Sequence, residues 1–240
     1  MNFIADMHTH TLASAHAYST ITENAAAAAE KGLKYLGKTD HSLKMDDSPH
    51  EWHFANMRAI PAVLNGVRII KGVEANLVGY NGETDLTDTI RGAVEWVNVS
   101  IHWGLLMPAD ETKHTDTYLA ATKDPKTCVL CHTDSHDFPY DYDAVTASCR
   151  DNNVLIELNA SRLYDQRSVK RLKECILPAC VKNGCNIIVN SDAHFWSHIA
   201  EFDRAEELLK ELDFPEELVI NADLQRFEDF LVSKGISLNG

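Results

Sequence analysis

Histidine and carboxylate residues recur along this sequence at the ends of short apolar runs, in spacings that suit metal binding. His8 and His10 form an H-x-H after the first run, and Asp192 and His194 form a D-x-H after the last one. Side chains two residues apart on an extended chain point to the same side, with their Cα atoms about 7 Å apart. Each pair can therefore converge on one ion or on two neighbouring ions.

Single residues of the same types follow the runs in between. His41, Glu74, His102 and His132 each stand near the end of one run, and His16 lies in the loop after the H-x-H. A zinc ion takes about four ligands, and a catalytic one keeps a position for water, so nine candidates exceed one ion. A bridging carboxylate, most simply Glu74, would spread them over two or three ions. Imidazole-rich coordination favours zinc, iron or manganese over magnesium and calcium.

The apolar runs predict seven strands, and helical segments alternate with them. The predicted strands cover residues 3–7, 35–38, 67–72, 96–101, 127–131, 155–158 and 187–190. The predicted helices cover residues 23–31, 52–63, 116–122, 143–152, 168–182 and 199–212. This alternation indicates a parallel sheet covered by helices, either a barrel or an open sheet. Six of the seven predicted strands end in a candidate ligand, and the carboxyl ends of parallel strands are where such folds build their sites.

Local signals add detail to this plan. Thr22 and either Ser197 or His198 are predicted to begin helices, and Gly32 and Gly184 to end them. Asn81-Gly82 predicts a hairpin within residues 76–85, and residues 224–233 predict a tail helix. No repeat or linker divides the chain, so we expect one domain over residues 1–240.

Composition restricts the partners. With 36 acidic and 22 basic residues, the net charge is −14, which disfavours a nucleic-acid partner. Bound cations would reverse this sign locally and admit a small anionic substrate. No apolar run approaches a membrane span and no export signal is visible, so we expect a cytoplasmic protein. The six cysteines have no framework spacing and are expected to be reduced.

The motifs, in order, resemble those of the PHP (polymerase and histidinol phosphatase) superfamily, and within it a branch of bacterial trinuclear-zinc phosphatases. H-x-H, T-D-H at His41, G-x-E at Glu74, then His102, His132 and S-D-A-H match over nearly the whole chain. The resemblance implies a distorted (β/α)₇ barrel with three Zn²⁺ ions at the C-terminal ends of the strands, with Mn²⁺ or Fe²⁺ as alternatives. It also implies a homo-oligomer, in the form of a trimer.

The resemblance assigns ligands to each ion. The first ion would be held by His8, His10, Glu74 and Asp192; the second by Glu74, His102 and His132; and the third by His16, His41 and His194. Two departures lie at the pocket rim: Trp103 stands where the branch leads us to expect an acidic residue, and Thr133-Asp-Ser-His136 replaces a Pro-Gly segment. They bear on the substrate more than on the metals.

The expected activity is hydrolysis of phosphate monoesters by metal-activated hydroxide, at a site built on His8, His10, Glu74 and Asp192. His50 and Arg58, with His53, are interpreted either as a lid over the phosphate or as surface residues. His136 and Arg162 are weaker rim candidates, whereas His114 and His198 are interpreted as solvated helix ends. A metal-dependent phosphodiesterase or nuclease and a non-catalytic metal-binding regulatory module remain alternatives.

Overall fold

A parallel sheet forms the centre of the structure, a computed structural model that describes residues 1–238. Seven strands pair in parallel in their order along the chain. They are β1 (Ala5–Asp6), β2 (Tyr35–Lys38), β4 (Val67–Asn76), β5 (Trp96–Ser100), β6 (Thr127–Leu130), β7 (Leu155–Asn159) and β8 (Ile187–Asn190). The short β3 (Val63–Leu64) pairs antiparallel with the start of β4.

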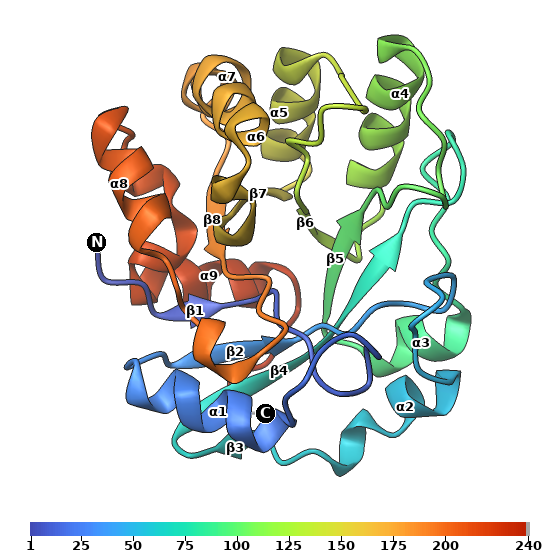
Figure 1. Ribbon diagram of the computed structural model, residues 1–240, viewed down its shortest axis with the longest axis vertical. Coiled ribbons are helices and arrows are strands. Elements are labelled where there is room, and N and C mark those ends of the chain that lie inside the picture. Colours follow the sequence, from blue (N-terminus) through green and yellow to red (C-terminus); the bar gives the residue numbers. More distant parts are fainter. Residues whose placement is uncertain (239–240) are drawn as a thin grey trace.

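The first and last strands of this sheet meet, so the sheet nearly closes into a barrel (Figure 1). The Met7 amide donates to Asn190 Oδ1 at 2.9 Å, and the His10 amide donates to the Ala193 carbonyl at 2.9 Å. A parallel bridge between Thr9 and Ala193 continues the closure beyond the strand ends. The distorted (β/α)₇ barrel expected from the sequence is therefore confirmed.

Helices cover the outside of the sheet, with α1 against β2 and β4, α4 against β6 and α5 against β7. They are α1 (Ile21–Glu30), α2 (Glu51–Ala55), α3 (Asp88–Ala93), α4 (Glu111–Thr122), α5 (Tyr142–Asp151), α6 (Gln166–Arg171), α7 (Leu177–Asn183), α8 (Asp203–Glu211) and α9 (Leu224–Ser233). A π-helical turn, Leu172–Ile176, joins α6 to α7. No helix within residues 1–238 combines the length and apolarity that a bilayer crossing requires.

The last helix closes the amino-terminal end of the barrel. Phe227 packs its ring edge-on against Tyr35 at 5.2 Å, and Phe230 packs edge-on against Trp96 at 5.7 Å. Tyr35 and Trp96 are the first residues of β2 and β5, and all four side chains belong to one buried cluster inside the barrel. Because this end is filled by apolar side chains, the opposite end is the one left for polar chemistry.

Several local predictions are confirmed. Each predicted strand has a counterpart, and α9 occupies the predicted range 224–233. Leu77 and Thr84 form the antiparallel bridge of the predicted hairpin. Gly184 ends α7 with a left-handed φ of 65°, a conformation in which glycine has no Cβ to clash. All six cysteines are free thiols.

Other helix boundaries were predicted wrongly. The helix expected over 52–63 stops at Ala55, continues only as a 3₁₀ turn, and gives way to β3. Pro61 excludes a helix through Ile60, which is extended with ψ 126°. The helix expected over 199–212 begins only at Asp203, since Ala200 is left-handed with φ 54°.

The start of α1 and the existence of α3 were also missed. Thr20, not Thr22, caps α1: its hydroxyl accepts the Glu23 amide at 3.2 Å while the Glu23 carboxylate accepts the Thr20 amide at 2.7 Å. This reciprocal T-x-x-E pattern is a capping signal. Helix α3 has a similar side-chain cap, in which Thr87 accepts the Ile90 amide.

Candidate metal centre

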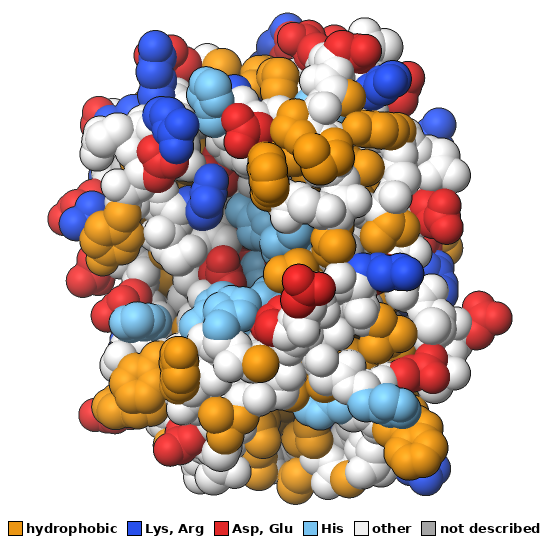
Figure 2. Space-filling model, turned by 45° about the vertical axis from the view of Figure 1, so that its right-hand side comes forward, with side chains coloured by type: hydrophobic (Ala, Val, Ile, Leu, Met, Phe, Trp, Pro, Cys, Tyr) orange, Lys and Arg blue, Asp and Glu red, His pale blue; other side chains and the backbone are white. Residues whose placement is uncertain are grey.

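The nine candidate ligands converge at the carboxyl end of the barrel, where Figure 2 shows histidines at the bottom of a hollow. His8 and His10 follow β1, His41 follows β2, and His102 and His132 follow β5 and β6. Glu74 lies inside β4 rather than at its end, two residues before Asn76, because β4 is longer than predicted. Asp192 and His194 follow β8, and His16 reaches in from the loop before α1.

Glu74 is the centre of this cluster, and its two carboxylate oxygens face different histidines. Oε2 lies 3.2 Å from Nε2 of both His8 and His41, and 3.5 Å from Nε2 of His10. Oε1 lies 3.0 Å from Nε2 of His132 and 3.4 Å from Nε2 of His102. A carboxylate placed in this way, with ligand groups on both sides, suits a bridge between two ions.

Asp192 and His194 form a second focus beside the first. Asp192 Oδ1 lies 3.1 Å from His10 Nε2 and 3.6 Å from His8 Nε2. The His194 ring stacks at 4.3 Å on His10 and at 4.4 Å on His16. One ligand atom from each of His10, His41 and His194 lies within 4.8 Å of the others, as do those of His8, His10 and Glu74.

Several buried atoms of the cluster have no hydrogen-bond partner among the described residues. They are the Nε2 atoms of His8, His10 and His194, Oε2 of Glu74 and Oδ1 of Asp192. Buried polar groups are nearly always hydrogen-bonded. A convergent set of nitrogen and oxygen atoms without partners therefore indicates that the site binds something between them. Imidazole nitrogens and carboxylate oxygens that meet at one point are the donor set of a transition-metal site. The residues present therefore fit a metal cluster.

A second layer of acceptors orients the imidazoles, and sequence reasoning missed it. His8 Nδ1 donates to Glu157 at 2.7 Å, and His102 Nδ1 donates to Asn76 Oδ1 at 2.6 Å. Asp47 Oδ2 accepts from Nδ1 of His16 at 2.8 Å and of His41 at 3.0 Å. Holding the proton on Nδ1 leaves the Nε2 lone pair free for an ion.

Only one of these acceptors had a recognisable signal. Glu157 is a buried glutamate inside the otherwise apolar β7, the one predicted strand for which no candidate ligand was named. Asp47 and Asn76 carry no such pattern, because loop geometry brings them to the imidazoles.

Two residues of the cluster have strained backbones. His132 has φ 32° and Asp192 has φ 55°, in the left-handed region that residues with a Cβ seldom adopt. The His132 amide is fixed by Glu157 Oε2 at 2.8 Å, and Asp192 Oδ2 accepts from Asn159 at 3.1 Å. Such strain persists only where the surroundings impose it, and it is concentrated at functional sites.

The electrostatics of the cluster keep its carboxylates charged. Burial by itself would raise the pKa of Glu74, but the histidines around it, His8 before His102, hold that pKa well below its usual range. Burial lowers the pKa of His10 to about 4, against the opposing influence of the nearby Asp192 carboxylate. An ionised Glu74 and a neutral His10 are the forms that bind cations.

The cluster opens to the surface through a cavity of about 310 Å³. Seven of the nine candidate ligands line it, and the other lining side chains are Met45, Ile101, Trp103, Ser135, Phe138 and Arg162. Arg162 is the cation among these lining residues; its Nε donates to Asp134 at 3.3 Å.

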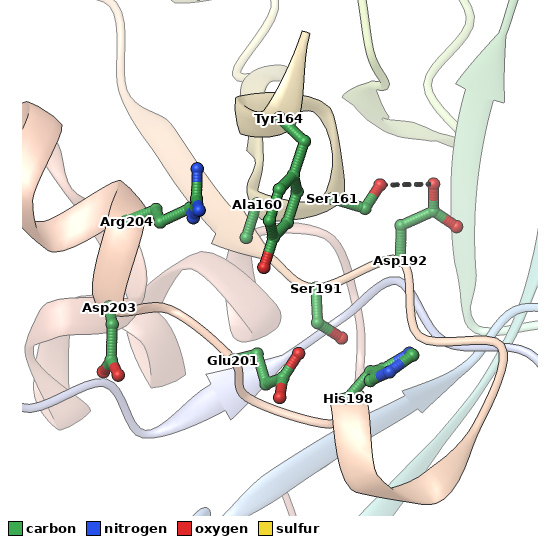
Figure 3. Close-up of a pocket in the computed structure, with 9 residues that line it drawn as sticks. All are labelled: Ala160, Ser161, Tyr164, Ser191, Asp192, His198, Glu201, Asp203 and Arg204. Carbon is green, nitrogen blue, oxygen red and sulfur yellow. Dashed lines mark hydrogen bonds between the residues drawn. The ribbon is translucent and has the colours of Figure 1, made fainter.

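A neighbouring cavity of about 410 Å³ touches Asp192 from the other side (Figure 3). There Ser161 donates to Asp192 Oδ2 at 3.5 Å, and the Arg204 guanidinium lies 3.9 Å from the centre of the Tyr164 ring. Asp192 thus lines both cavities.

Other histidines and arginines singled out in the sequence lie elsewhere. His50 caps α2 by accepting the Trp52 amide at 3.2 Å, and Arg58 is exposed; neither lines the metal-site cavity, so the lid stays a prediction. His53 contacts Asp40 at 3.4 Å instead. His114 was predicted wrongly: it is buried and bonded to the Ala109 amide and the Pro139 carbonyl, because α4 packs its first turn inward.

Known proteins resemble this chain over nearly its whole length. The family model of the PHP domain matches residues 6–213. A probable phosphatase of Photobacterium profundum is 37% identical, covering 98% of this chain and 96% of its own. One of Clostridium acetobutylicum is 35% identical, covering 98% of this chain and 97% of its own.

Solved structures share the fold at lower identity. Histidinol phosphate phosphatase of Lactococcus lactis, complexed with zinc, L-histidinol and phosphate, aligns with a TM-score of 0.59 at 17% identity and covers 88% of this chain and 94% of its own. A chain of an archaeal ribonuclease P with mature tRNA aligns with a TM-score of 0.61 at 12% identity, covering 98% and 93%. At these identities the likeness concerns the fold.

Proposed function

The chain belongs to the PHP domain family, and from this premise we propose that it is a metal-dependent phosphatase that hydrolyses phosphate monoesters at a trinuclear centre. Curated relatives of 35–37% identity that span nearly its full length are named probable phosphatases, which supports the reaction class. A fold relative, a histidinol phosphate phosphatase, is complexed with zinc, L-histidinol and phosphate. A small phosphorylated molecule is therefore the proposed substrate.

The observation that carries the proposal is the set of unpartnered buried atoms around Glu74 and Asp192. Following the family resemblance, we assign the nine candidate ligands to three ions: one held by His8, His10, Glu74 and Asp192, one by Glu74, His102 and His132, and one by His16, His41 and His194. Bound divalent ions of this kind lower the pKa of water toward about 7 and neutralise charge on phosphoryl oxygens. Zn²⁺ is the proposed metal, with Mn²⁺ or Fe²⁺ as alternatives.

The protein's own groups then orient the substrate. Arg162 is the cation among the residues lining the cavity, and only part of its guanidinium is engaged, by Asp134 and by Ser168 Oγ at 3.3 Å. Its remaining N–H groups can donate to a phosphate oxygen. Glu157 and Asp47 hold the imidazoles in one tautomer so that no reorganisation is needed during turnover.

The test combines metal content with hydrolysis. Protein purified without added metal is subjected to elemental analysis and assayed with p-nitrophenyl phosphate, beside a His10→Ala variant. We expect about three equivalents of zinc, iron or manganese, and loss of activity in the variant. His136→Ala, which removes an exposed histidine that is not among the cavity-lining residues, is the matched control.

Other outcomes would point to other functions. A metal content of zero or one, with no hydrolysis after reconstitution, would refute the phosphatase and favour a metal-binding regulatory module. Faster cleavage of bis(p-nitrophenyl) phosphate than of the monoester would favour a phosphodiesterase, which the net charge of −14 disfavours for polyanionic substrates.

A further inference from the structure

An exposed tryptophan stands at the mouth of the metal-site cavity. Trp103 follows the candidate ligand His102 and is 68% exposed. Its backbone is fixed in a tight turn, because the amides of Leu105 and Leu106 both donate to the His102 carbonyl, at 3.2 and 3.3 Å. Gly104 has φ 95°, which glycine adopts without a Cβ clash. The indole therefore projects from a defined point on the rim.

The indole has open faces. Among the described residues, Trp103 makes no ring–ring or cation–ring contact, although twenty such ring pairs occur elsewhere in the structure. Tyr164, which is equally 68% exposed and lines the neighbouring cavity, differs in this respect: the Arg204 guanidinium lies 3.9 Å from its ring centre (Figure 3). Of the two rims that meet at Asp192, only the one with Trp103 offers an unoccupied aromatic surface.

The rest of the cavity lining does not favour a second charge on the substrate. Beyond the candidate ligands, apolar side chains dominate the lining, with Ile101, Met45 and Phe138 among them. The one lining cation, Arg162, is the group that we assign to the phosphate itself. An additional anion on the part of the substrate that lies at the rim would therefore face no free cation there.

We propose that Trp103 forms the leaving-group subsite of this enzyme, and that its substrates are monoesters of alcohols with an uncharged planar aromatic ring that stacks on the indole. The inference rests on the proposed phosphatase activity and specifies its substrate class. Trp103 lines the same cavity of about 310 Å³ as the candidate ligands, so one substrate can offer its ring to the indole and its phosphate to the histidines. Aromatic pairs of this kind favour binding by about two- to tenfold beyond the area they bury.

Two substrates isolate the contribution of the aromatic ring. Benzyl phosphate and cyclohexylmethyl phosphate carry leaving groups of the same size and similar basicity, so their chemical steps are alike and only planarity differs. The measured quantity is the ratio of their kcat/KM values with metal-loaded protein. We expect a ratio of about two to ten in the wild type, because one aromatic pair is gained.

Variants of the protein test which side chain contacts the aromatic ring of the substrate. Trp103→Ala should reduce the ratio to about one, whereas Trp103→Phe should retain most of it, since phenylalanine still offers an aromatic face. Tyr164→Ala is the matched control: it removes an equally exposed aromatic ring from the adjoining cavity and should leave the ratio at its wild-type value. Elemental analysis of each variant verifies that the metal content is unchanged.

The results separate this inference from the function on which it rests. A wild-type ratio near one, with both esters hydrolysed, overturns the subsite and leaves the phosphatase intact; a ratio lost in Tyr164→Ala assigns the ring to the other cavity and also overturns it. If neither ester is hydrolysed, the proposed function fails. Calorimetric binding of benzylphosphonate and cyclohexylmethylphosphonate then decides: a preference for the first that Trp103→Ala abolishes supports the subsite, and equal binding refutes it.

Discussion

Glu157→Gln tests whether the second layer of the site controls the first. The two carboxylate oxygens of Glu157 accept four hydrogen bonds. Oε1 accepts from His8 Nδ1 at 2.7 Å and Asn190 Nδ2 at 2.9 Å. Oε2 accepts from the His132 amide at 2.8 Å and Asn159 Nδ2 at 3.1 Å. Glutamine has nearly the same shape, but it replaces one of these two acceptors with an NH₂ group.

Either orientation of the new amide damages the site. If the NH₂ group faces His8, it can bond only to the Nδ1 lone pair, which moves the imidazole proton to Nε2, the atom that points at Glu74. If it faces the His132 amide instead, a donor meets a donor beneath a residue with φ 32°. Each donor left without an acceptor costs about 1–3 kcal/mol of stability. Lost orientation of a ligand costs about 10- to 100-fold in metal affinity, or about 1.4–2.7 kcal/mol.

Metal affinity is the decisive readout. Zinc is titrated into metal-free protein near neutral pH in competition with a chromophoric chelator, and urea unfolding monitors the fold. The control is Glu174→Gln, which removes a charge that is 61% exposed and has one ion pair, at 3.9 Å. If a folded Glu157→Gln protein binds zinc within about threefold of the wild type, the orienting role of Glu157 is refuted.

Three further predictions concern other parts of the molecule. Asp47→Asn should lower the zinc content by about one equivalent in elemental analysis, because it weakens the acceptor shared by two imidazoles. Burial by itself would raise the pKa of Asp124, but hydrogen bonds from Arg91 at 2.7 and 2.8 Å lower it. The pair therefore stabilises the fold above the unfolded pKa of about 3.9, and this contribution is lost as the pH falls through the lowered folded value. Asp124→Asn should cost about 1 kcal/mol in urea unfolding at neutral pH, and its difference from the wild type should vanish in acid. Gly37→Ala should lower the unfolding free energy by about 1–3 kcal/mol, since its Cβ would lie 2.8 Å from the backbone of Met7, whereas Gly92→Ala, with no atom within 4 Å, should not.

The candidate ligands could be found from the sequence because their positions follow from strand periodicity. His8 and His10 had to share a face, and His41, Glu74 and His102 had to meet at one edge, since parallel strands bring their carboxyl ends together. Strand periodicity is a local property of the sequence, so it can be recognised without knowing how the chain packs. The structure places their ring nitrogens within 3.2 to 3.5 Å of the Glu74 oxygens.

The orienting acceptors could not be found in the same way. Asp47 reaches His16 from 31 residues away, and Glu157 reaches His8 from 149 residues away. A hydrogen bond across such a separation depends on how loops and strands pack, and no local pattern encodes it. The burial of His114 likewise came from packing.

The sequence by itself thus determined the order of strands and helices, the end of the barrel that carries chemistry, and the residue types that gather there, because alternation and spacing are local properties of the chain. Only the tertiary structure decided which atoms remain unpartnered, which oxygen of Glu74 faces which histidine, and which rim keeps an open aromatic face at Trp103. These features depend on distances between segments far apart in the chain, and distances of that kind are fixed only when side chains pack to nearly solid density.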